Sequence, residues 1–297
     1  MGSLKTLALA GALATASAGS ALAADLFAPP PPAPAPMVQE FGGWYLRGDV
    51  GVGAQSLGSV AGADVISSGG SFWRKSIGDA AFAGAGIGYQ FNSFLRFDVT
   101  GEYRTSARYD ISDKFNYTRG SFDEIDTRQT NHYKGDLSST VVLANAYLDL
   151  GTWGGITPFV GAGVGFAHHR IRNASDSGLI YNYYAGTDIP VDLSSGYTAT
   201  EVTGGTAADG SRTNLAWAVH AGLGYQATSN LKLELAYRYL NMGDARTGTL
   251  TCLCGSEYSS LKLKDIDSHD IKFAMRWMLG GPVVAPVAVE APLIRKY

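Results

Sequence analysis

The sequence is poor in cysteine and in charge, and it has no long apolar run beyond its first residues. Its 297 residues include two cysteines, and 23 Lys and Arg against 26 Asp and Glu give a formal net charge of −3. No stretch after residue 23 approaches the roughly 20 apolar residues of a membrane-spanning helix. No transmembrane helix is therefore predicted, and the slightly acidic balance leaves no basic surface for nucleic acid.

The first 23 residues have the pattern of a secretory signal peptide. Lys5 precedes an apolar stretch over residues 7–18, and the segment ends in Ala21-Leu22-Ala23, where Ala21 and Ala23 form an A-x-A cleavage signal. An uncleaved membrane anchor is disfavoured because the apolar stretch is short for a span. We expect the mature chain to begin at Ala24-Asp25.

Two proline-rich segments flank one expected domain. Residues 24–42 favour a stiff, extended periplasmic spacer, which reaches roughly 60 Å at ~3.1 Å per residue. A second Pro-rich periplasmic tail covers residues 280–297. The region 43–279 between them is expected to form a single domain.

Alternating apolar and charged residues predict eight strands in this domain. In a soluble domain the apolar face would be buried, but here the other face carries so much charge that we expect apolar side chains outward and polar ones inward. Glycine makes up about 13% of the chain, against a usual level of about 7%, which suits a tightly curved sheet with a crowded interior. The predicted strands are 43–55, 80–91, 94–104, 137–150, 157–168, 213–227, 231–240 and 269–279.

Short and long connections alternate along the chain. The short ones are 92–93, 151–156 and 228–230, and the long ones are 56–79, 105–136, 169–212 and 241–268. This pattern predicts an all-β fold, an eight-stranded antiparallel transmembrane β-barrel with short periplasmic turns and long extracellular loops. An even number of strands places both termini in the periplasm, and outward aromatics near the strand ends fit interfacial girdles.

Thirteen charged side chains are expected to face the barrel lumen. Eight strands leave an interior just wide enough for side chains, and unpaired buried charge is costly, so seven cations and six anions predict a paired, closed network. An ion path through the lumen is the alternative. The expected network consists of Arg47, Asp49, Arg96, Asp98, Glu102, Arg104, Asp149, Lys232, Glu234, Arg238, Asp270, Lys272 and Arg276.

Three motifs occur in order across the domain: GWYLRGD at 43–49, TPFVGAGVG at 157–165 and LAYRYL at 235–240. With them the chain resembles the small eight-stranded outer-membrane β-barrel proteins of alphaproteobacteria described as surface antigens or outer-membrane immunogenic proteins. The resemblance implies an abundant structural protein of the envelope, although some members are described as porins. Several related proteins begin with an Ala-Asp pair that is linked to peptidoglycan, and Ala24-Asp25 matches that start.

The reactive side chains form no catalytic or metal motif. Cys252 and Cys254 are a disulfide candidate in an exported protein, either as a tight local ring or as a redox-active or intermolecular pair. His168 and His169 are adjacent on a strand and point to opposite faces, which makes them a poor metal pair. No nucleophile motif stands out, so we expect no enzyme activity, no metal and no cofactor.

We expect a structural outer-membrane protein that supports the envelope and is tethered covalently to peptidoglycan through Ala24-Asp25. A mature N-terminus without further modification is the alternative to the tether. Outer-membrane lipid and lipopolysaccharide are the other expected partners, and the oligomeric state is left open. A small diffusion channel would show a steady unit conductance, whereas a loop-borne adhesin or receptor would use the Ser-, Gly- and Tyr-rich connections.

Overall fold

The computed structural model describes residues 43–62, 70–119, 124–253 and 255–279. The chain divides into two compact units, Met1–Val38 and Gln39–Tyr297, and the first of these lies outside the described residues. The predicted signal cleavage site, the Ala24-Asp25 attachment site, the spacer and the 280–297 tail also lie outside them. In the described part of the chain, no helix is long and apolar enough to cross a membrane.

The described residues form thirteen antiparallel strands and one short 3-10 helix. The elements are β1 (Gly43–Ala61), β2 (Ser71–Ile77), β3 (Ala80–Gln90), β4 (Leu95–Arg119), β5 (Ile125–Asp149), β6 (Ile156–Tyr184), η1 (Leu193–Ser195), β7 (Thr200–Ala207), β8 (Gly210–Gln226), β9 (Leu231–Asn241), β10 (Ala245–Arg246), β11 (Leu250–Cys252), β12 (Glu257–Tyr258) and β13 (Lys262–Met278).

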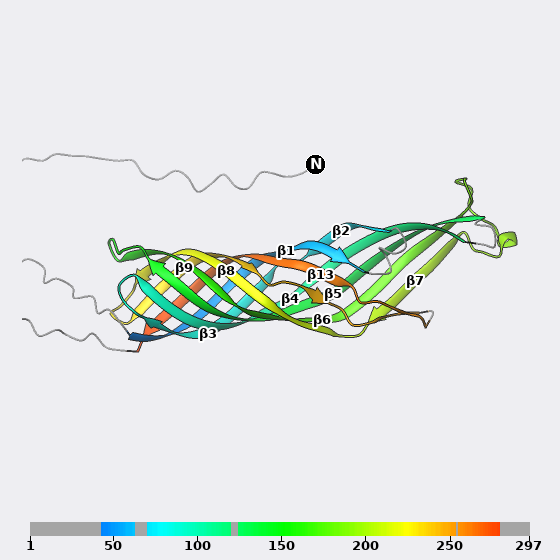
Figure 1. The fold of residues 1–297 in the computed structure, drawn as a ribbon. Helices are drawn as coiled ribbons and strands as arrows, with labels where there is room; N and C mark the ends of the chain where they lie inside the picture. The colour runs from blue at the N-terminus through cyan, green and yellow to red at the C-terminus, as the bar shows by residue number, and fades with distance from the viewer. Residues whose placement is uncertain (1–42, 63–69, 120–123, 254, 280–297) are drawn as a thin grey trace, which may run out of the picture. The chain divides into compact units, whose positions relative to one another are not determined.

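Eight of these strands pair in a closed circuit. The order of pairing is β1, β3, β4, β5, β6, β8, β9 and β13, and β13 pairs back with β1 (Figure 1). Each of the eight contains one of the predicted segments to within one residue at its ends. Because the last strand pairs with the first, the backbone groups of these ladders find partners within the circuit. Over the residues that pair on both sides, no strand of the circuit is an edge strand.

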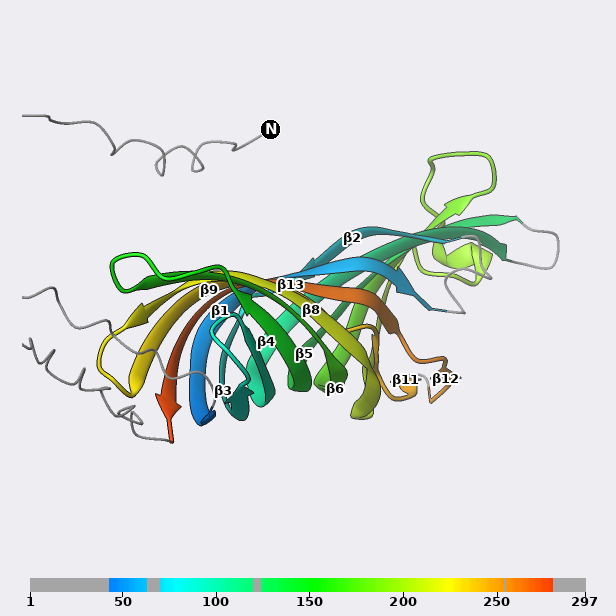
Figure 2. The same ribbon diagram turned by 60° about the vertical axis from the view of Figure 1, so that its left-hand side comes forward.

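The long connections are not simple loops, and that prediction is wrong. β4 and β5 each run for 25 residues and β6 for 29, well into the segments 105–136 and 169–212. We call the extension the distal sheet: residues 107–119 of β4, 125–137 of β5 and 171–184 of β6, with β2, β7, β11 and β12 (Figure 2). Parts of its strands carry polar residues on both faces, as at 112–114 and 129–131, so the hydrophobic contrast that marks a strand in sequence is weak there.

The outward face of the circuit is apolar, as the alternation predicts. Val52, Phe166 and Leu235 are examples, and each is more than half exposed. Leu46 and Ile87 are neighbours on adjacent strands and are also exposed. A soluble protein rarely exposes a continuous apolar surface of this kind, so it marks a contact with lipid or protein.

The inward face has two layers, and only one of them is charged. The prediction of a polar interior throughout is wrong for the other layer, because β5 carries apolar residues on both faces, with Val141 and Leu143 inward and Val142 outward. These inward residues pack into one cluster with side chains from seven of the eight circuit strands. We call it the apolar layer: Leu57, Tyr109, Ile111, Tyr133, Leu137, Val141, Leu143, Ala167, Ile171, Ala174, Ala216, Ala218, Leu240, Met242, Ala245, Leu250, Leu261, Leu263 and Ile266.

Candidate functional site

The circuit brings the predicted lumen charges together in its interior. Twelve of the thirteen are buried, none of them more than 6% exposed. The exception is Lys232 at the start of β9, which is half-buried and has no ion pair within 4 Å among the described residues. We call the twelve buried side chains the charge layer.

Glu234 is the centre of the first part of the charge layer. Its Oε1 lies 3.1 Å from Arg96 Nη1 and 3.1 Å from Arg276 Nη2, and its Oε2 lies 3.6 Å from Arg47 Nη2. Arg96 Nη1 and Glu234 Oε1 are close but are not aligned as a hydrogen bond, so this contact is mainly electrostatic. One carboxylate thus balances parts of three buried guanidinium groups.

Arg47 connects this centre to two aspartates. Its Nη1 lies 2.6 Å from Asp98 Oδ2 and its Nη2 lies 2.8 Å from Asp49 Oδ1. Lys272 Nζ lies 3.4 Å from the same Asp49 oxygen. On the other side of Glu234, Arg96 Nε donates to Asp149 Oδ1 at 3.1 Å. Every carboxylate named here therefore faces at least one cation.

The second part is a square of alternating charge. Arg238 donates to both oxygens of Glu102, at 2.7 and 2.8 Å, and its Nε donates to Asp270 at 2.8 Å. Arg104 donates to Glu102 at 3.2 Å and to the two Asp270 oxygens at 3.0 and 2.8 Å. Both guanidinium groups lie over the ring of Phe82, 4.8 and 4.9 Å from its centroid. The forked pairing supplies the hydrogen bonds that make a buried ion pair tolerable.

The charge layer also has aromatic partners, which the alternation of charged residues does not predict. The Arg96 guanidinium lies 4.2 Å from the centroid of Tyr147 and 4.6 Å from that of Phe159, and the Tyr45 hydroxyl donates to Asp98 at 3.0 Å. A signal was present, because Tyr45 has the same strand parity as the inward charges that follow it on β1. These rings fill space between the cations and add cation–π attraction.

Two glycines show how crowded this interior is. A Cβ on Gly53 would overlap the side chains of Arg104 and Asp270, and a Cβ on Gly163 would overlap the amide oxygen of Asn145. At these positions glycine provides the space that a charged or amide side chain from a neighbouring strand occupies.

The histidines have hydrogen-bonding roles, with one exception. Buried His169 contacts Ser139 Oγ at 2.7 Å through Nδ1 and the Met242 carbonyl at 3.0 Å through Nε2, whereas His168 is exposed and contacts Thr213. Both nitrogens of buried His220 lack a hydrogen-bond partner among the described residues.

Metal and cysteine chemistry add no further centre. The described residues contain no group of three or more His, Cys, Asp or Glu that could hold a metal ion. Cys252, at the end of β11, is disulfide-bonded. Its predicted partner Cys254 lies outside the described residues.

A carboxylate pair lies on the inward face of the distal sheet. Asp113 accepts hydrogen bonds from Asn131 Nδ2 at 3.0 Å and from the Tyr133 hydroxyl at 2.8 Å. Asp176 Oδ1 is buried without a hydrogen-bond partner in the described part of the chain. Burial, and secondly the charge of Asp113, raise the pKa of Asp176 to about 7.

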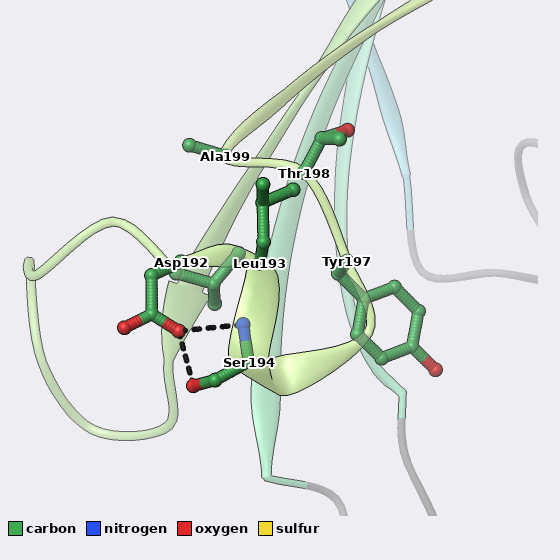
Figure 3. Close-up of a pocket in the computed structure, with 7 residues that line it drawn as sticks. Asp192, Leu193, Ser194, Tyr197, Thr198 and Ala199 are labelled. Atoms are coloured by element: carbon green, nitrogen blue, oxygen red, sulfur yellow. Dashed lines mark hydrogen bonds between the residues drawn. The ribbon is translucent and has the colours of Figure 1, made fainter.

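A shallow hollow lies at the tip of the distal sheet, between β6 and β7. Val191, Leu193, Tyr197 and Ala199 are among the residues that line it (Figure 3). Asp192 caps η1 by accepting hydrogen bonds from the backbone and the hydroxyl of Ser194. The hollow is mostly apolar and has no cluster of reactive groups.

Comparison with known proteins finds partial similarity. No family model matches the chain. A Brucella abortus (strain 2308) protein, "Uncharacterized protein BAB2_0314", is 29% identical over 247 residues, which cover 76% of this chain and 77% of that protein. Outer membrane protein PagN of Salmonella typhimurium is 26% identical over 206 residues, which cover 68% of this chain and 75% of PagN.

Solved structures of outer-membrane proteins are similar to this chain at low sequence identity. Outer membrane protein OprG from Pseudomonas aeruginosa is 14% identical, with a TM-score of 0.39 over 80% of this chain and 97% of OprG. Neisserial surface protein A is 15% identical, with a TM-score of 0.36 over 80% of this chain and 99% of that protein.

Removing the charge of Glu234 should destabilise the fold. Glu234→Gln leaves Arg96, Arg276 and Arg47 with less compensation, and we expect a loss of about 3–5 kcal/mol in the free energy of unfolding. Glu257→Gln, an exposed carboxylate on β12 without an ion pair among the described residues, is the control and should change it by less than about 0.5 kcal/mol. Denaturant unfolding in detergent measures both, and equal losses would contradict the central role of Glu234.

The distal sheet should loosen as the pH rises. The raised pKa of Asp176 means that the folded sheet holds its proton more tightly than the unfolded chain, so this contribution is present at low pH and is lost between about pH 4 and pH 7. Hydrogen exchange of the β6 amides, corrected for its intrinsic pH dependence, should show less protection at pH 8 than at pH 4.5. Asp176→Asn should remove this difference, whereas Asp110→Asn on the outward face should keep it.

Proposed function

We propose that this chain is a bacterial outer-membrane β-barrel whose eight circuit strands span the membrane and whose role is structural and non-catalytic. The observation that carries the proposal is the inverted burial of the circuit, with an apolar face outward and paired charge inward. A closed circuit also satisfies the backbone, which lipid requires. The similarity to PagN supports the outer-membrane location.

The interior of the proposed barrel is closed at two levels. The charge layer fills one level with ion pairs, and the apolar layer fills the next with packed side chains from seven circuit strands. An ion that crossed the apolar layer would lose its hydration without gaining a polar partner. This packing favours a plugged structural barrel over the diffusion channel.

The short connections 91–94, 150–155 and 227–230 belong in the periplasm in this proposal, and the distal sheet belongs outside the cell. This orientation follows the usual asymmetry of turns and loops in such barrels. The same orientation places the mature N-terminus in the periplasm, where Ala24-Asp25 can reach peptidoglycan across the proline-rich spacer.

The distal sheet favours surface binding as a second function. It exposes large apolar side chains far from the proposed membrane: Leu193 and Val202 are each 82% exposed, and Ile189 is 62% exposed. Isolated exposed apolar residues are ordinary, but three on the same protruding end suit a binding surface. Trimming the loop 185–199 would separate this function from that of the barrel.

A cation on the outward face should be costly only where that face contacts lipid. Val219 lies near the middle of the outward apolar residues of β8, and Val202 lies on the distal sheet. For Val219→Arg we expect a loss of about 2–4 kcal/mol in the free energy of unfolding in lipid vesicles, and for Val202→Arg a change of about 0–1 kcal/mol. Equal effects of the two substitutions would contradict the membrane-spanning circuit.

The tether has a direct chemical test. Cell walls boiled in SDS and digested with muramidase and protease should release a peptide that begins at Ala24 and carries a cell-wall stem peptide. Asp25→Asn should lower the wall-bound fraction, because it changes the attachment site, while the amount of folded barrel stays the same. Mass spectrometry that finds only free Ala24, with no protein in the wall fraction, would contradict the proposed tether but not the proposed barrel.

A further inference from the structure

Three cations lie together on the outward face where β10 meets β13. Arg246 and Lys262 are register partners, and Lys264 lies two residues further along the same face of β13. All three side chains are exposed. Opposite side chains in an antiparallel pair have Cβ atoms about 5 Å apart. This register therefore holds two like charges close together, and their repulsion disfavours the pairing.

Buried neighbours set this register. Ala245 pairs with Leu263, and both are fully buried in the apolar layer. Leu261 is also buried, and its carbonyl accepts a hydrogen bond from the Thr247 backbone at 3.0 Å. Because strand side chains alternate with a period of two, burying these residues forces the cations between them outward.

None of the three cations has an ion pair within 4 Å among the described residues. Asp244, two residues before Arg246, and Asp265, next to Lys264, are the acidic residues beside them in the sequence, and Asp244 instead contacts Arg212 at 3.5 Å. Another outward pair of cations, Arg170 and Arg172 on β6, differs in this respect, because both contact Asp209, at 3.2 and 3.8 Å. Among the described residues, the three cations on β10 and β13 therefore form no direct ion pair, although they lie on a paired ladder.

The distance between the cluster and the outward apolar face of the circuit limits which groups the three cations can contact. Along β13 the outward apolar residues end at Ile271, and His269 follows, 5.3 Å from the ring of Tyr239. Lys264 is five residues beyond His269 and Lys262 is seven, which is about 16 Å and about 23 Å along a strand and less along the axis of a tilted barrel. Long cationic side chains can reach back toward an interface over several ångströms.

We propose that Arg246, Lys262 and Lys264 bind the phosphate groups of a phosphorylated glycolipid in the outer leaflet of the membrane. This inference rests on the proposed function, because the barrel must span the membrane with its distal sheet outside. Phosphate oxygens complement three cations that have no ion-paired carboxylate in the described part of the chain, and charge-assisted hydrogen bonds to them are strong. The lipid also relieves the repulsion that the buried register imposes between Arg246 and Lys262.

The test uses the full chain folded in detergent and measures lipid binding by native mass spectrometry. The probes are lipid A with both phosphates and the same lipid A after dephosphorylation. We expect Arg246→Gln/Lys262→Gln/Lys264→Gln to weaken binding of the phosphorylated lipid at least about tenfold, since each cation near a membrane surface contributes separately. Dephosphorylated lipid should bind the wild type and the triple variant equally weakly.

Arg170→Gln/Arg172→Gln is the matched control. It also removes outward cations beyond the outward apolar face, but at a site where Asp209 compensates their charge. We expect it to change the affinity by less than about threefold. A loss as large as that of the triple variant would overturn the proposal in favour of general surface charge. Complete displacement of the lipid by millimolar inorganic phosphate would overturn the lipid as the occupant.

Folding is measured separately for each variant. The heat-dependent shift in gel mobility of a folded barrel is recorded in the detergent used for binding, before lipid A is added, and also in phospholipid vesicles. A wild-type chain that gives no folded barrel in vesicles would overturn the proposed function and this site together. A folded barrel whose triple variant binds phosphorylated lipid as tightly as the wild type would overturn the site alone.

Discussion

Burial of paired charge inside a closed ring of strands is the constraint on which the rest of this structure depends. Glu234 lies among three guanidinium groups, and Arg104 and Arg238 share Glu102 and Asp270. Breaking one member of such a pair leaves an uncompensated charge in a medium that solvates it poorly. The aromatic rings and glycines around the pairs serve this arrangement, since the rings cover the cations and the glycines make room for them.

The apolar layer gives the interior a second, different kind of order. Ion pairs specify which side chains must meet, whereas the packed aliphatic side chains of Val141, Leu143 and Leu240 exclude water and ions. Together they make the inside of the circuit resemble a small protein core more than a pore. The same buried layer reaches β10 and sets the register that turns Arg246 and Lys262 outward.

Much of the circuit could be predicted from the sequence, because strand parity needs only local information. Arg47 and Asp49 share one face with Tyr45, and the outward residues between them are apolar, so their burial follows from a period of two. The sequence pattern does not predict the apolar layer, because residues 141–144 are apolar on both faces and no alternation marks the inward side there. The sequence predicts loops where the distal sheet lies, because residues such as 129–131 are polar on both faces of their strand. Pairs such as Arg104 with Asp270 depend on how the ring closes, which no local pattern reveals.

The partners in the charge square come from distant parts of the chain. Arg104 and Asp270 are 166 positions apart, and Glu102 and Arg238 are 136 positions apart. An open sheet that lacked β13 would leave Arg104, Glu102 and Arg238 facing one another without Asp270. Closing the ring therefore completes the neutralisation of its interior, because β13 supplies Asp270, Lys272 and Arg276, and a sheet without β13 would enter hydrocarbon with unpaired interior charge. Assembly of this chain should therefore be cooperative, because pairing of the last strand supplies the charges that complete the interior ion pairs.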